Sequence, residues 1–420
     1  MDTDPVVVGI RETWGKETPF GFTQKDRRHH VYVAGQTGVG KSTLLGNMFV
    51  QDMHDGQGVG FIDPHGDLSS ELLDYIPPWR VQDVVYFNPA DEQYPIGFNL
   101  LRSDAKPHLI ASGVVGAFKS IWRDSWGPRL EYILGAAVAA LAECDNVSLL
   151  SLQRMLSDAP YRAWVERQIK DPFVQALWRK EINAYSRTAF QEAVSPIQNK
   201  VGQVLMSPQI RNIVGQVASR FNARSIMDNK RIFIANLSKG RLGEDKSNLL
   251  GALLVAHFQL AAMSRADVLE HERTDFNLIV DEFQSFASDS FTSILSEARK
   301  YRLCLTLSHQ YMEQVKPEIR QAVFGNVGSI ITFRVGQTDA EILERQFGGA
   351  FPASTLTGLP NHQVCAKLLF GGHLSEPFLG RTLQPVETRH GRREQVIRWS
   401  REKYATKRRV VEDRIRRWME

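Results

Sequence analysis

The sequence predicts an α/β protein with a mainly parallel sheet, an inserted all-helical domain and a basic helix at the end of the chain. Three features support this prediction. A β-branched run at 30–34 leads directly into a glycine-rich loop and a helical pattern. Short apolar runs of the same kind occur on both sides of a long central stretch. Between residues 103 and 228, the apolar residues instead follow helical spacing, and β-branched runs are scarce.

The bounds of each predicted element lie where an apolar run meets a polar or glycine-containing segment. The predicted strands comprise residues 30–34, 58–63, 83–87, 231–237, 276–282, 303–310, 329–335 and 365–370. Helical patterns cover 42–53, 246–265 and a basic, Trp-containing segment at 396–419, and the central stretch accommodates four to seven helices. The predicted domains are therefore a core formed by 1–102 and 229–385, an insertion at 103–228 and a tail at 386–420.

Composition excludes a mostly disordered chain. The 420 residues are 43% hydrophobic and 23% charged, with a mean hydropathy of −0.27, which is typical of a globular protein with a core. No uncharged apolar run reaches the roughly 18 residues of a membrane span. The best candidate, Leu249–Met263, is expected to be a buried helix. Cys144, Cys304 and Cys365 have no metal-ligand or disulfide spacing, and no secretory signal is apparent, so we expect a cytoplasmic protein.

Positive charge is concentrated at the end of the chain. From Arg381 onward there are 13 Lys and Arg against 6 Asp and Glu, although the whole chain has a net charge of only +4. Such a tail indicates an anionic partner or, equally well, a solvated helix.

The clearest chemical motif follows the first predicted strand. Its pattern, Gly-x-x-x-x-Gly-Lys-Ser between a strand and a helix, is that of a phosphate-binding loop. The glycines allow positive φ and close backbone approach, so that successive N–H groups surround a phosphate. The lysine supplies charge to the β- and γ-phosphates, and the serine hydroxyl is placed to bind Mg²⁺. The sequence thus predicts ATP binding with Mg²⁺ by Gly35, Gln36, Thr37, Gly38, Val39, Gly40, Lys41, Ser42 and Thr43.

A second acidic motif ends the strand at 276–282. Carboxylates at the carboxyl end of a parallel strand lie where open α/β sheets bind ligands. Asp281 is expected to hold Mg²⁺, directly or through water, and Glu282 to activate the attacking water as a general base. This pair favours hydrolysis over transfer to a small acceptor. The alternative is an acidic pair that caps the following helix.

Two further polar residues lie at or within predicted strands. Gln310 ends the strand at 303–310, where it either contacts the γ-phosphate or makes ordinary turn hydrogen bonds. Arg334 interrupts an apolar strand and therefore needs a partner. That partner is either an acid of the same chain or, if subunits form a ring, the γ-phosphate bound to a neighbour.

The segment Asp63-Pro-His-Gly-Asp67 closes the second predicted strand. Pro64 and Gly66 predict a turn with Asp67 as a helix cap. Contact of Asp63 or His65 with nucleotide or Mg²⁺ is the less favoured alternative.

Several of these segments together resemble the ATPase domain of type IV secretion coupling proteins, which belong to the superfamily of ring-shaped DNA-pumping ATPases that includes the FtsK and HerA motors. The resemblance covers most of the chain. It is carried by residues 26–68, 95–100, 279–288, 296–310, 324–336 and 401–420.

This resemblance implies a RecA-like P-loop NTPase core with an inserted all-helical domain. It also implies a hexameric ring with ATP between subunits and DNA in the centre. Lys41 and Ser42 match the Walker A pair, Asp281 and Glu282 the Walker B pair, Gln310 the sensor and Arg334 the arginine that acts on the neighbouring site. Coupling proteins carry membrane helices before the motor, whereas this chain has about 25 polar residues there, so we expect any anchorage through a membrane-bound secretion partner.

The leading hypothesis is an ATP-driven DNA translocase serving conjugative transfer, with Arg299, Lys300 and Arg302 as candidate phosphate contacts or as a solvated helix end. The alternatives are an ATPase with a protein cargo bound by the helical insertion, and a nucleotide-gated assembly module. Glu282 argues against such a module, because it has no need of a catalytic base.

Overall fold

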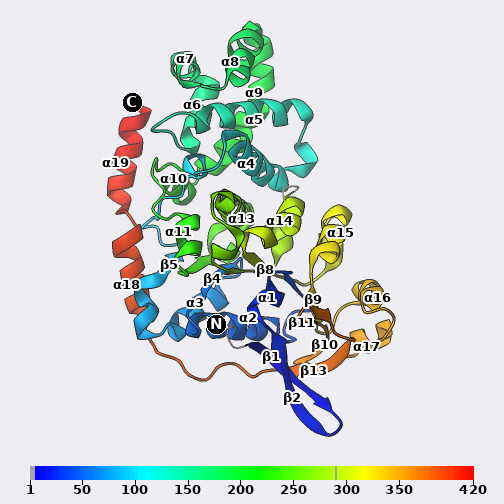
Figure 1. The fold of residues 1–420 in the computed structure, drawn as a ribbon. Helices are drawn as coiled ribbons and strands as arrows, with labels where there is room; N and C mark the ends of the chain where they lie inside the picture. Colours follow the sequence, from blue (N-terminus) through cyan, green and yellow to red (C-terminus); the bar gives the residue numbers. More distant parts are fainter. Residues whose placement is uncertain (1–4, 289–290) are drawn as a thin grey trace. The chain divides into compact units, whose positions relative to one another are not determined.

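A computed structural model describes residues 5–288 and 291–420 of the chain. Its main sheet has the strand order β2-β1-β13-β10-β9-β3-β8-β7-β4-β6-β5 (Figure 1). The strands from β9 to β5 are parallel neighbours, and the other four extend the sheet antiparallel. The predicted α/β fold with a mainly parallel sheet is therefore confirmed. The parallel strands are β3 (Val31–Ala34), β4 (Gly58–Asp63), β5 (Val84–Phe87), β6 (Ile232–Asn236), β7 (Phe276–Val280), β8 (Leu303–His309) and β9 (Ser329–Thr332).

The antiparallel part of the sheet includes a hairpin that the sequence analysis missed. Its strands lie in the first part of the chain, for which only polar residues were expected. Trp14 and Gly15 form the connection with φ of 53° and 72°. Hairpin turns of this kind usually contain Asn-Gly or Asp-Gly, so Trp-Gly carries a weak turn signal. The antiparallel strands are β1 (Val6–Thr13), β2 (Lys16–Phe22), β10 (Gln363–Lys367) and β13 (Phe378–Thr382); β11 (Leu369–Phe370) and β12 (His373–Leu374) pair separately.

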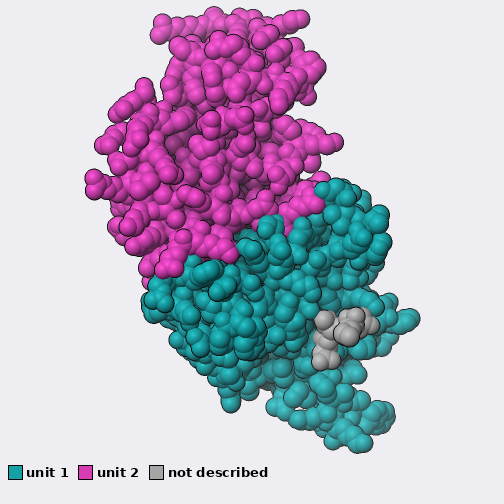
Figure 2. All heavy atoms as spheres, turned by 60° about the vertical axis from the view of Figure 1, so that its left-hand side comes forward, with its two compact units in different colours: residues 1–87, 225–238, 265–399 teal, residues 88–224, 239–264, 400–420 magenta. Residues whose placement is uncertain are grey.

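Two compact units divide the described chain (Figure 2). Unit 1 comprises residues 1–87, 225–238 and 265–399, and unit 2 comprises 88–224, 239–264 and 400–420. The sequence analysis placed 239–264 in the core and 400–420 in a separate tail. In the structure, both segments belong to the helical unit.

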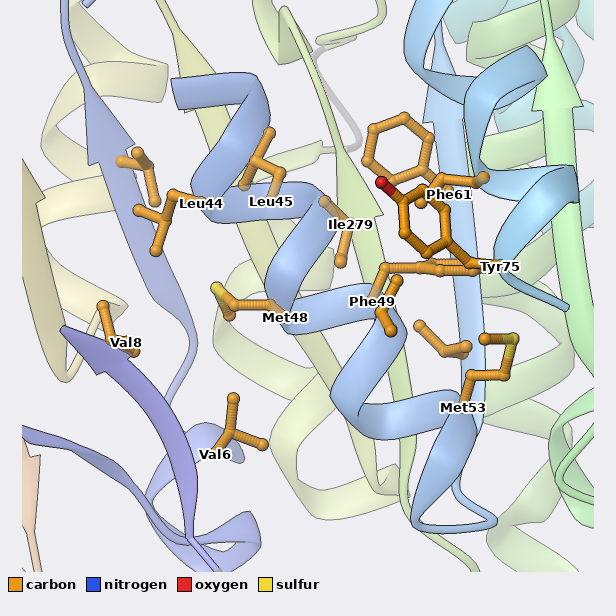
Figure 3. Packing of buried hydrophobic residues seen from close by; sticks show 14 of the residues in the cluster. Val6, Val8, Leu44, Leu45, Met48, Phe49, Met53, Phe61, Tyr75 and Ile279 are labelled. Atoms are coloured by element: carbon orange, nitrogen blue, oxygen red, sulfur yellow. The ribbon is translucent and has the colours of Figure 1, made fainter. Parts of the chain in front are cut away.

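The core of unit 1 forms where helix α2 (Lys41–His54) packs on the sheet (Figure 3). One face of α2 is apolar and fully buried, and Phe49 meets Phe61 of β4 edge to face, with ring centroids 6.1 Å apart. Burying each such side chain stabilises the fold by about 1.5–3 kcal/mol. This packing fixes the start of α2, where the predicted phosphate loop ends. The contacts involve Leu44, Leu45, Met48, Phe49 and Met53 of α2 with Val6, Val8, Phe61, Tyr75 and Ile279.

The remaining helices of unit 1 connect the strands or cover the sheet. They include α1 (Gln24–Arg27), α3 (Asp67–Leu72), α14 (Phe291–Glu297), α15 (Pro317–Asn326), α16 (Gln337–Gln346) and α17 (Ala353–Thr357).

Unit 2 is helical, as the spacing of its apolar residues predicts. Residues 103–228 contain eight α-helices rather than four to seven, because several helices are shorter than two turns and carry little periodic signal. These helices are α4 (Pro107–Ile121), α5 (Pro128–Ala142), α6 (Leu149–Ser157), α7 (Ala159–Gln168), α8 (Pro172–Ala176), α9 (Arg187–Leu205), α10 (Pro208–Val214) and α11 (Ala223–Asp228).

Helix α13 (Glu244–Ser264) follows α12 (Lys239–Leu242) and packs against α4 in unit 2. Among the described residues, one segment, Glu244–Asp267, has the length and apolar composition of a membrane span. However, 72% of its most apolar window is buried in the structure. The expectation of a buried helix at Leu249–Met263 is confirmed.

The predicted single helix at 396–419 is wrong in one respect, because the structure has two helices, α18 (Arg393–Tyr404) and α19 (Arg408–Met419). Backbone hydrogen bonds to another segment interrupt the helix. The N–H of Thr406 donates to the carbonyl of Pro95 (3.1 Å), and the N–H of Arg408 donates to that of Gln93 (2.9 Å). These bonds replace the i to i−4 bonds that a continuous helix requires.

Candidate nucleotide-binding site

The predicted phosphate loop connects β3 to α2 in unit 1, and its glycines are needed for two different reasons. Gly38 and Gly40 have φ of 77° and 118°, which L side chains rarely adopt. Gly35 does not have a positive φ, contrary to the expectation for all three glycines. A Cβ on Gly35 would lie 2.7 Å from the Cβ of Phe333, so close packing excludes a side chain there. The loop geometry therefore depends on the neighbouring strand as well as on the turn.

Lys41 begins α2 and is held on its own loop. Its Nζ donates to the carbonyls of Gly35 and Gln36, the latter at 2.9 Å. Desolvation by burial lowers the pKa of Lys41, against the opposing effect of the nearby Glu282 and Asp281 carboxylates. The ammonium thus has backbone partners that a bound anion can replace.

Asp281 and Glu282 directly follow β7 and are both buried. Burial, together with the charges of Glu282 and Asp63, raises the pKa of Asp281 to about 6. Glu282 has φ of 47° and donates its N–H to Oδ1 of Asp281 (3.0 Å). A non-glycine residue in this conformation is strained, and such strain is found at functional sites.

Three side chains contact the carboxylate of Glu282. Nε2 of Gln310 donates to Oε1 (2.7 Å), Nε2 of Gln284 donates to Oε2 (2.6 Å), and Nε2 of His65 lies 3.9 Å from Oε1. Burial disfavours the charged carboxylate, but its contacts with His65, Gln284 and Gln310 outweigh that effect and lower the pKa of Glu282 to about 2. The carboxylate also raises the pKa of His65. Glu282 is therefore ionised and fixed in one orientation.

Gln310 also connects Glu282 to the phosphate loop. Its Oε1 accepts a hydrogen bond from Oγ1 of Thr37 (2.8 Å). Gln310 lies directly after β8, and β8 pairs with both β3 and β7, so the ends of these three strands meet. The structure thereby joins Thr37, Gln310 and Glu282 in one hydrogen-bonded chain.

Arg334 lies close to the start of the same loop, with no acidic partner among the described residues. Its guanidinium donates to Oε1 of Gln36 (3.4 Å), the carbonyl of Leu359 (3.3 Å) and Oδ1 of Asn361 (3.1 Å). Its own carbonyl accepts from the N–H of Gln36 (2.9 Å). The side chain of Arg334 is therefore bound by polar groups of its own chain.

These residues surround a cavity of about 630 Å³. Gly35 and Val39 are buried and support the loop from behind, whereas most of the other predicted nucleotide-binding residues line the cavity. Besides the carboxylates, its lining includes residues of α2 and several apolar side chains. The lining residues are Thr37, Gly38, Gly40, Lys41, Ser42, Thr43, Gly46, Asn47, Val50, Asp63, His65, Asp67, Leu68, Glu71, Leu72, Tyr75, Asp281, Glu282, Gln310, His362, Pro385 and Val386.

Sequence reasoning missed three residues of this site or misjudged them. His65 was interpreted as part of a turn, Gln284 lies two residues after Glu282, and His362 comes from a distant loop. His362 has φ of 64°, donates its N–H to the carbonyl of Val39 (2.9 Å), and its ring would lie 2.8 Å from a Cβ on Gly40. His65 had been considered as a nucleotide or Mg²⁺ contact but was the less favoured alternative, Gln284 lies beside the acidic pair, and His362 had no sequence signal.

The turn at Asp63–Asp67 is present, but its capping residue differs from the prediction. Asp67 is the first residue of α3, and the carboxylate of Asp63 accepts from the N–H groups of His65 and Ser69, both at 2.8 Å. Gly66 holds the position before the helix and has no side chain, so Asp63 supplies the acceptor for the N–H of Ser69 in the first turn.

The three basic residues that follow α14 have different surroundings. Arg302 is bonded to Asp275 at 3.7 Å and is largely buried. Arg299 and Lys300 are exposed, and the ammonium of Lys300 lies 5.3 Å from the ring centre of Tyr301. Of the three, Arg299 and Lys300 are the ones accessible to a partner.

The sheet and the loop define unit 1 as a RecA-like, phosphate-loop α/β domain. Residues 19–350 match the family described as the type IV secretion-system coupling protein DNA-binding domain, and the chain belongs to that family. This confirms the resemblance noted in the sequence. A search of curated protein sequences finds no match.

Solved structures of the coupling protein TrwB and of VirB4 share the fold. The bacterial conjugative coupling protein TrwBΔN70, in an unbound monoclinic form, has a TM-score of 0.64 at 15% identity, covering 93% of this chain and 91% of that one. TrwB in complex with ADP and Mg²⁺ has a TM-score of 0.61 at 17% identity, covering 90% and 91%. VirB4 of Thermoanaerobacter pseudethanolicus has a TM-score of 0.54 at 13% identity, covering 94% and 99%.

Proposed function

We propose that this chain is a Mg²⁺-dependent ATP hydrolase that works as a ring and moves DNA for a type IV secretion system. The observation that carries the proposal is the chain of contacts from Thr37 through Gln310 to Glu282, beside the lysine of the phosphate loop. A base that is joined to the phosphate loop can respond to the nucleotide bound there.

The residues present fit a nucleotide and its metal ion. Lys41 is bonded only to backbone carbonyls of the loop, which a phosphate can replace. Asp281 is a buried carboxylate whose raised pKa reflects its need for a cation. The described residues include no group of three or more His, Cys, Asp or Glu that could hold a metal ion, but Mg²⁺ bound with a nucleotide needs only one or two protein ligands. Ser42 and Asp281 would hold Mg²⁺, which supplies positive charge to the phosphate oxygens.

In this proposal, Glu282 accepts the proton of the attacking water at one of its carboxylate oxygens. Gln310 exchanges a hydrogen bond with Thr37 or Glu282 for one with the γ-phosphate, and it returns to its present partners when the γ-phosphate has left. Gln284 keeps Oε2 of Glu282 in place while Oε1 is released. A prearranged carboxylate lowers the reorganisation needed in the transition state.

Arg334 acts on the nucleotide of a neighbouring subunit in this proposal. For that role, its guanidinium has to leave Gln36, Leu359 and Asn361. The bond from the N–H of Gln36 to the carbonyl of Arg334 would then transmit the change to the phosphate loop. Closure of the ring and the state of the loop would in this way be coupled.

DNA is the proposed cargo because the family is described by DNA binding and coupling. Structures of TrwB, described as a plasmid or conjugative coupling protein, hold ADP with Mg²⁺ and non-hydrolysable ATP and GTP analogues. We extend these ligands to this chain as a proposal, with ATP as the physiological nucleotide. Because a hydrolase of this kind needs ATP, we propose that the protein works on the cytoplasmic side of the membrane. A membrane-bound secretion component is the proposed anchor.

Steady-state ATP hydrolysis at low salt, with and without double- or single-stranded DNA, tests the proposal. We expect DNA to raise the rate several-fold, added salt to remove this effect, and Glu282→Gln to abolish hydrolysis while nucleotide binding is retained. Omission of Mg²⁺ should also stop the reaction.

Hydrolysis that depends on Glu282 but not on any DNA would overturn the DNA motor and direct the search to a protein bound by unit 2. Nucleotide binding without Glu282-dependent hydrolysis would instead support an assembly module.

A further inference from the structure

Helix α19 in unit 2 has one buried face and one exposed, basic face. Val411 and Ile415 are buried, and α19 lies alongside α10 (Figure 1), with Glu412 accepting from Nδ2 of Asn212 (3.2 Å). At the other end of the helix, the carbonyl of Trp418 accepts from Arg154 of α6 (2.9 Å). The helix is therefore fixed on the body of unit 2, with one side left to solvent.

Arg401 at the end of α18 and Arg408 at the start of α19 are both paired with acids. Arg401 binds Asp91 (2.7 Å), and Arg408 binds both Glu92 (3.1 Å) and Glu412 (2.7 Å). Asp413, the other acid of α19, is bonded to Arg416 (2.8 Å). Both carboxylates of α19 are thus already engaged.

The exposed cations differ from these. Lys407, Arg409, Arg414 and Arg417 are exposed and have no ion-pair partner in residues 5–288 and 291–420. We call these four residues the α19 basic face. Lys407 and Arg417 are ten residues apart, which corresponds to about 15 Å along a helix. A DNA duplex presents about nine phosphate charges over that length.

Helix stability does not explain the whole α19 basic face. Arg417 lies in the last turn of α19, where a cation interacts favourably with the helix dipole, and Arg414 lies further inside the helix, where the dipole has little effect. Lys407 and Arg409 lie at the amino end, where a cation is unfavourable, and the first turn has no acid. Two of the four cations therefore oppose the stability of the helix that carries them.

The surroundings of α19 favour a nucleic acid over a membrane. An interfacial helix buries its apolar face in lipid. In α19 that face is already covered by protein, since Val411 and Ile415 are buried. The exposed apolar residues of α19, Val410 and Met419, are nine residues apart, which places them on opposite sides of the helix, so they form no continuous apolar surface. Four unmatched cations on such a helix suit a polyanion recognised through its charge.

We propose that the α19 basic face is a second, sequence-independent contact surface for the DNA phosphate backbone. The proposal rests on DNA as the partner in the proposed function and adds the surface in unit 2 that binds it. This surface lies beyond residues 19–350, to which the DNA-binding family description applies.

The test measures binding of a short duplex of arbitrary sequence by fluorescence anisotropy between about 50 and 200 mM salt. The variant replaces Lys407, Arg409, Arg414 and Arg417 with Gln. We expect affinity at the lowest salt to fall about tenfold or more, and the slope of log K against log salt to fall by about 0.9 for each lost contact. ATP hydrolysis without DNA should be unchanged, because the nucleotide site lies in unit 1.

A matched control removes the same charge from other exposed positions of unit 2, by replacing Arg167, Lys170, Arg179 and Lys180 with Gln. This control should bind nearly as the original chain does. A second variant, with Lys in place of Arg409, Arg414 and Arg417, keeps the charge and should retain binding, because Lys also contacts phosphate as a point charge.

Equal losses in the α19 variant and the matched control would overturn the proposal in favour of a net-charge effect. Normal DNA binding by the α19 variant, with weaker binding to phosphatidylserine vesicles, would overturn it in favour of a membrane contact. If the unaltered chain itself binds no DNA, the proposed function fails, and with it the partner proposed for this surface.

Discussion

The nucleotide site of unit 1 and the α19 basic face of unit 2 both carry charge, but they hold it in opposite ways. Around the site, Glu282 has three contacting side chains and Lys41 has two backbone partners. The four cations of the α19 basic face have no ion-pair partner in the described chain, whereas Arg416 of the same helix is paired with Asp413. A site in which Glu282 and Lys41 already have partners works by exchanging those partners when a ligand arrives. A surface without partners works through its electric field, which salt screens.

The largest expected effect is the loss of nucleotide affinity in Lys41→Ala. Lys41 is buried, and residues 35–43 of the loop contain no other cation that could take over its role. Removing one partner of a buried charge contact costs about 2–5 kcal/mol, so nucleotide affinity should fall by about 30-fold to several thousand-fold. Titration with a fluorescent ATP analogue measures this loss.

The response of this loss to salt tests the comparison itself. Because buried contacts are screened less than exposed ones, the loss in Lys41→Ala should persist at high salt. The loss of DNA binding in the α19 variant should fade as salt rises. If the loss of nucleotide affinity in Lys41→Ala disappeared at high salt, the charges of the two regions would be screened alike and the comparison would be wrong.

A smaller effect is expected for Gln310→Ala, which removes the two hydrogen bonds that link Thr37 to Glu282 through Gln310. The rate constant kcat for ATP hydrolysis should fall on the order of 100-fold, as for loss of one prearranged hydrogen-bond donor, with little change in nucleotide affinity. Single-turnover hydrolysis separates the two quantities. Thr37→Val serves as the matched control. It removes the hydrogen bond from Thr37 to Gln310 and leaves the hydrogen bond from Gln310 to Glu282. Equal defects in affinity and kcat would show that Gln310 only supports the loop.

Contiguous motifs and buried strands were predictable from the sequence, because local pattern determines both. The strand at 58–63 has the predicted bounds, and the phosphate loop and the Asp281–Glu282 pair lie where expected. Their meeting also follows from the sequence, since the carboxyl ends of parallel strands share one edge of a sheet. The roles of these residues remain predictions.

Features that depend on tertiary contacts were not predictable. The ring of His362 lies on Gly40 although the residues are far apart in the sequence, and its positive φ has no local signal. The break between α18 and α19 depends on hydrogen bonds to Pro95 and Gln93, which compete with helix formation from a distance. The hairpin at Trp14 lacked the residues that usually mark such a turn.

The smallest effect expected is on stability, and it concerns the charge at Asp281. Burial and neighbouring carboxylates raise its pKa to about 6, above the ordinary value of 3.8, so the folded protein favours the protonated form. Stability from this group is present below about pH 4 and is lost as the pH rises to about 6. In Mg²⁺-free buffer at neutral pH, Asp281→Asn should therefore raise the free energy of unfolding by about 1–3 kcal/mol. Thermal unfolding should show this gain at neutral pH and none near pH 4.

The control for this prediction is Asp275→Asn, which makes the same change at a carboxylate that has a partner. Burial raises the pKa of Asp275 as well, but both of its oxygens accept hydrogen bonds from Arg28 at 2.8 Å. Asn cannot keep this ion pair and leaves the Arg28 charge without it, so the substitution should lower the midpoint of thermal unfolding. Opposite signs for the two substitutions are expected because one carboxylate lacks a cation partner and the other has one. When Mg²⁺ and ATP are added, the original chain should become more stable than Asp281→Asn, since the carboxylate of Asp281 would then have a cation. A lower unfolding midpoint for Asp281→Asn in Mg²⁺-free buffer would mean that the charge is already balanced within unit 1.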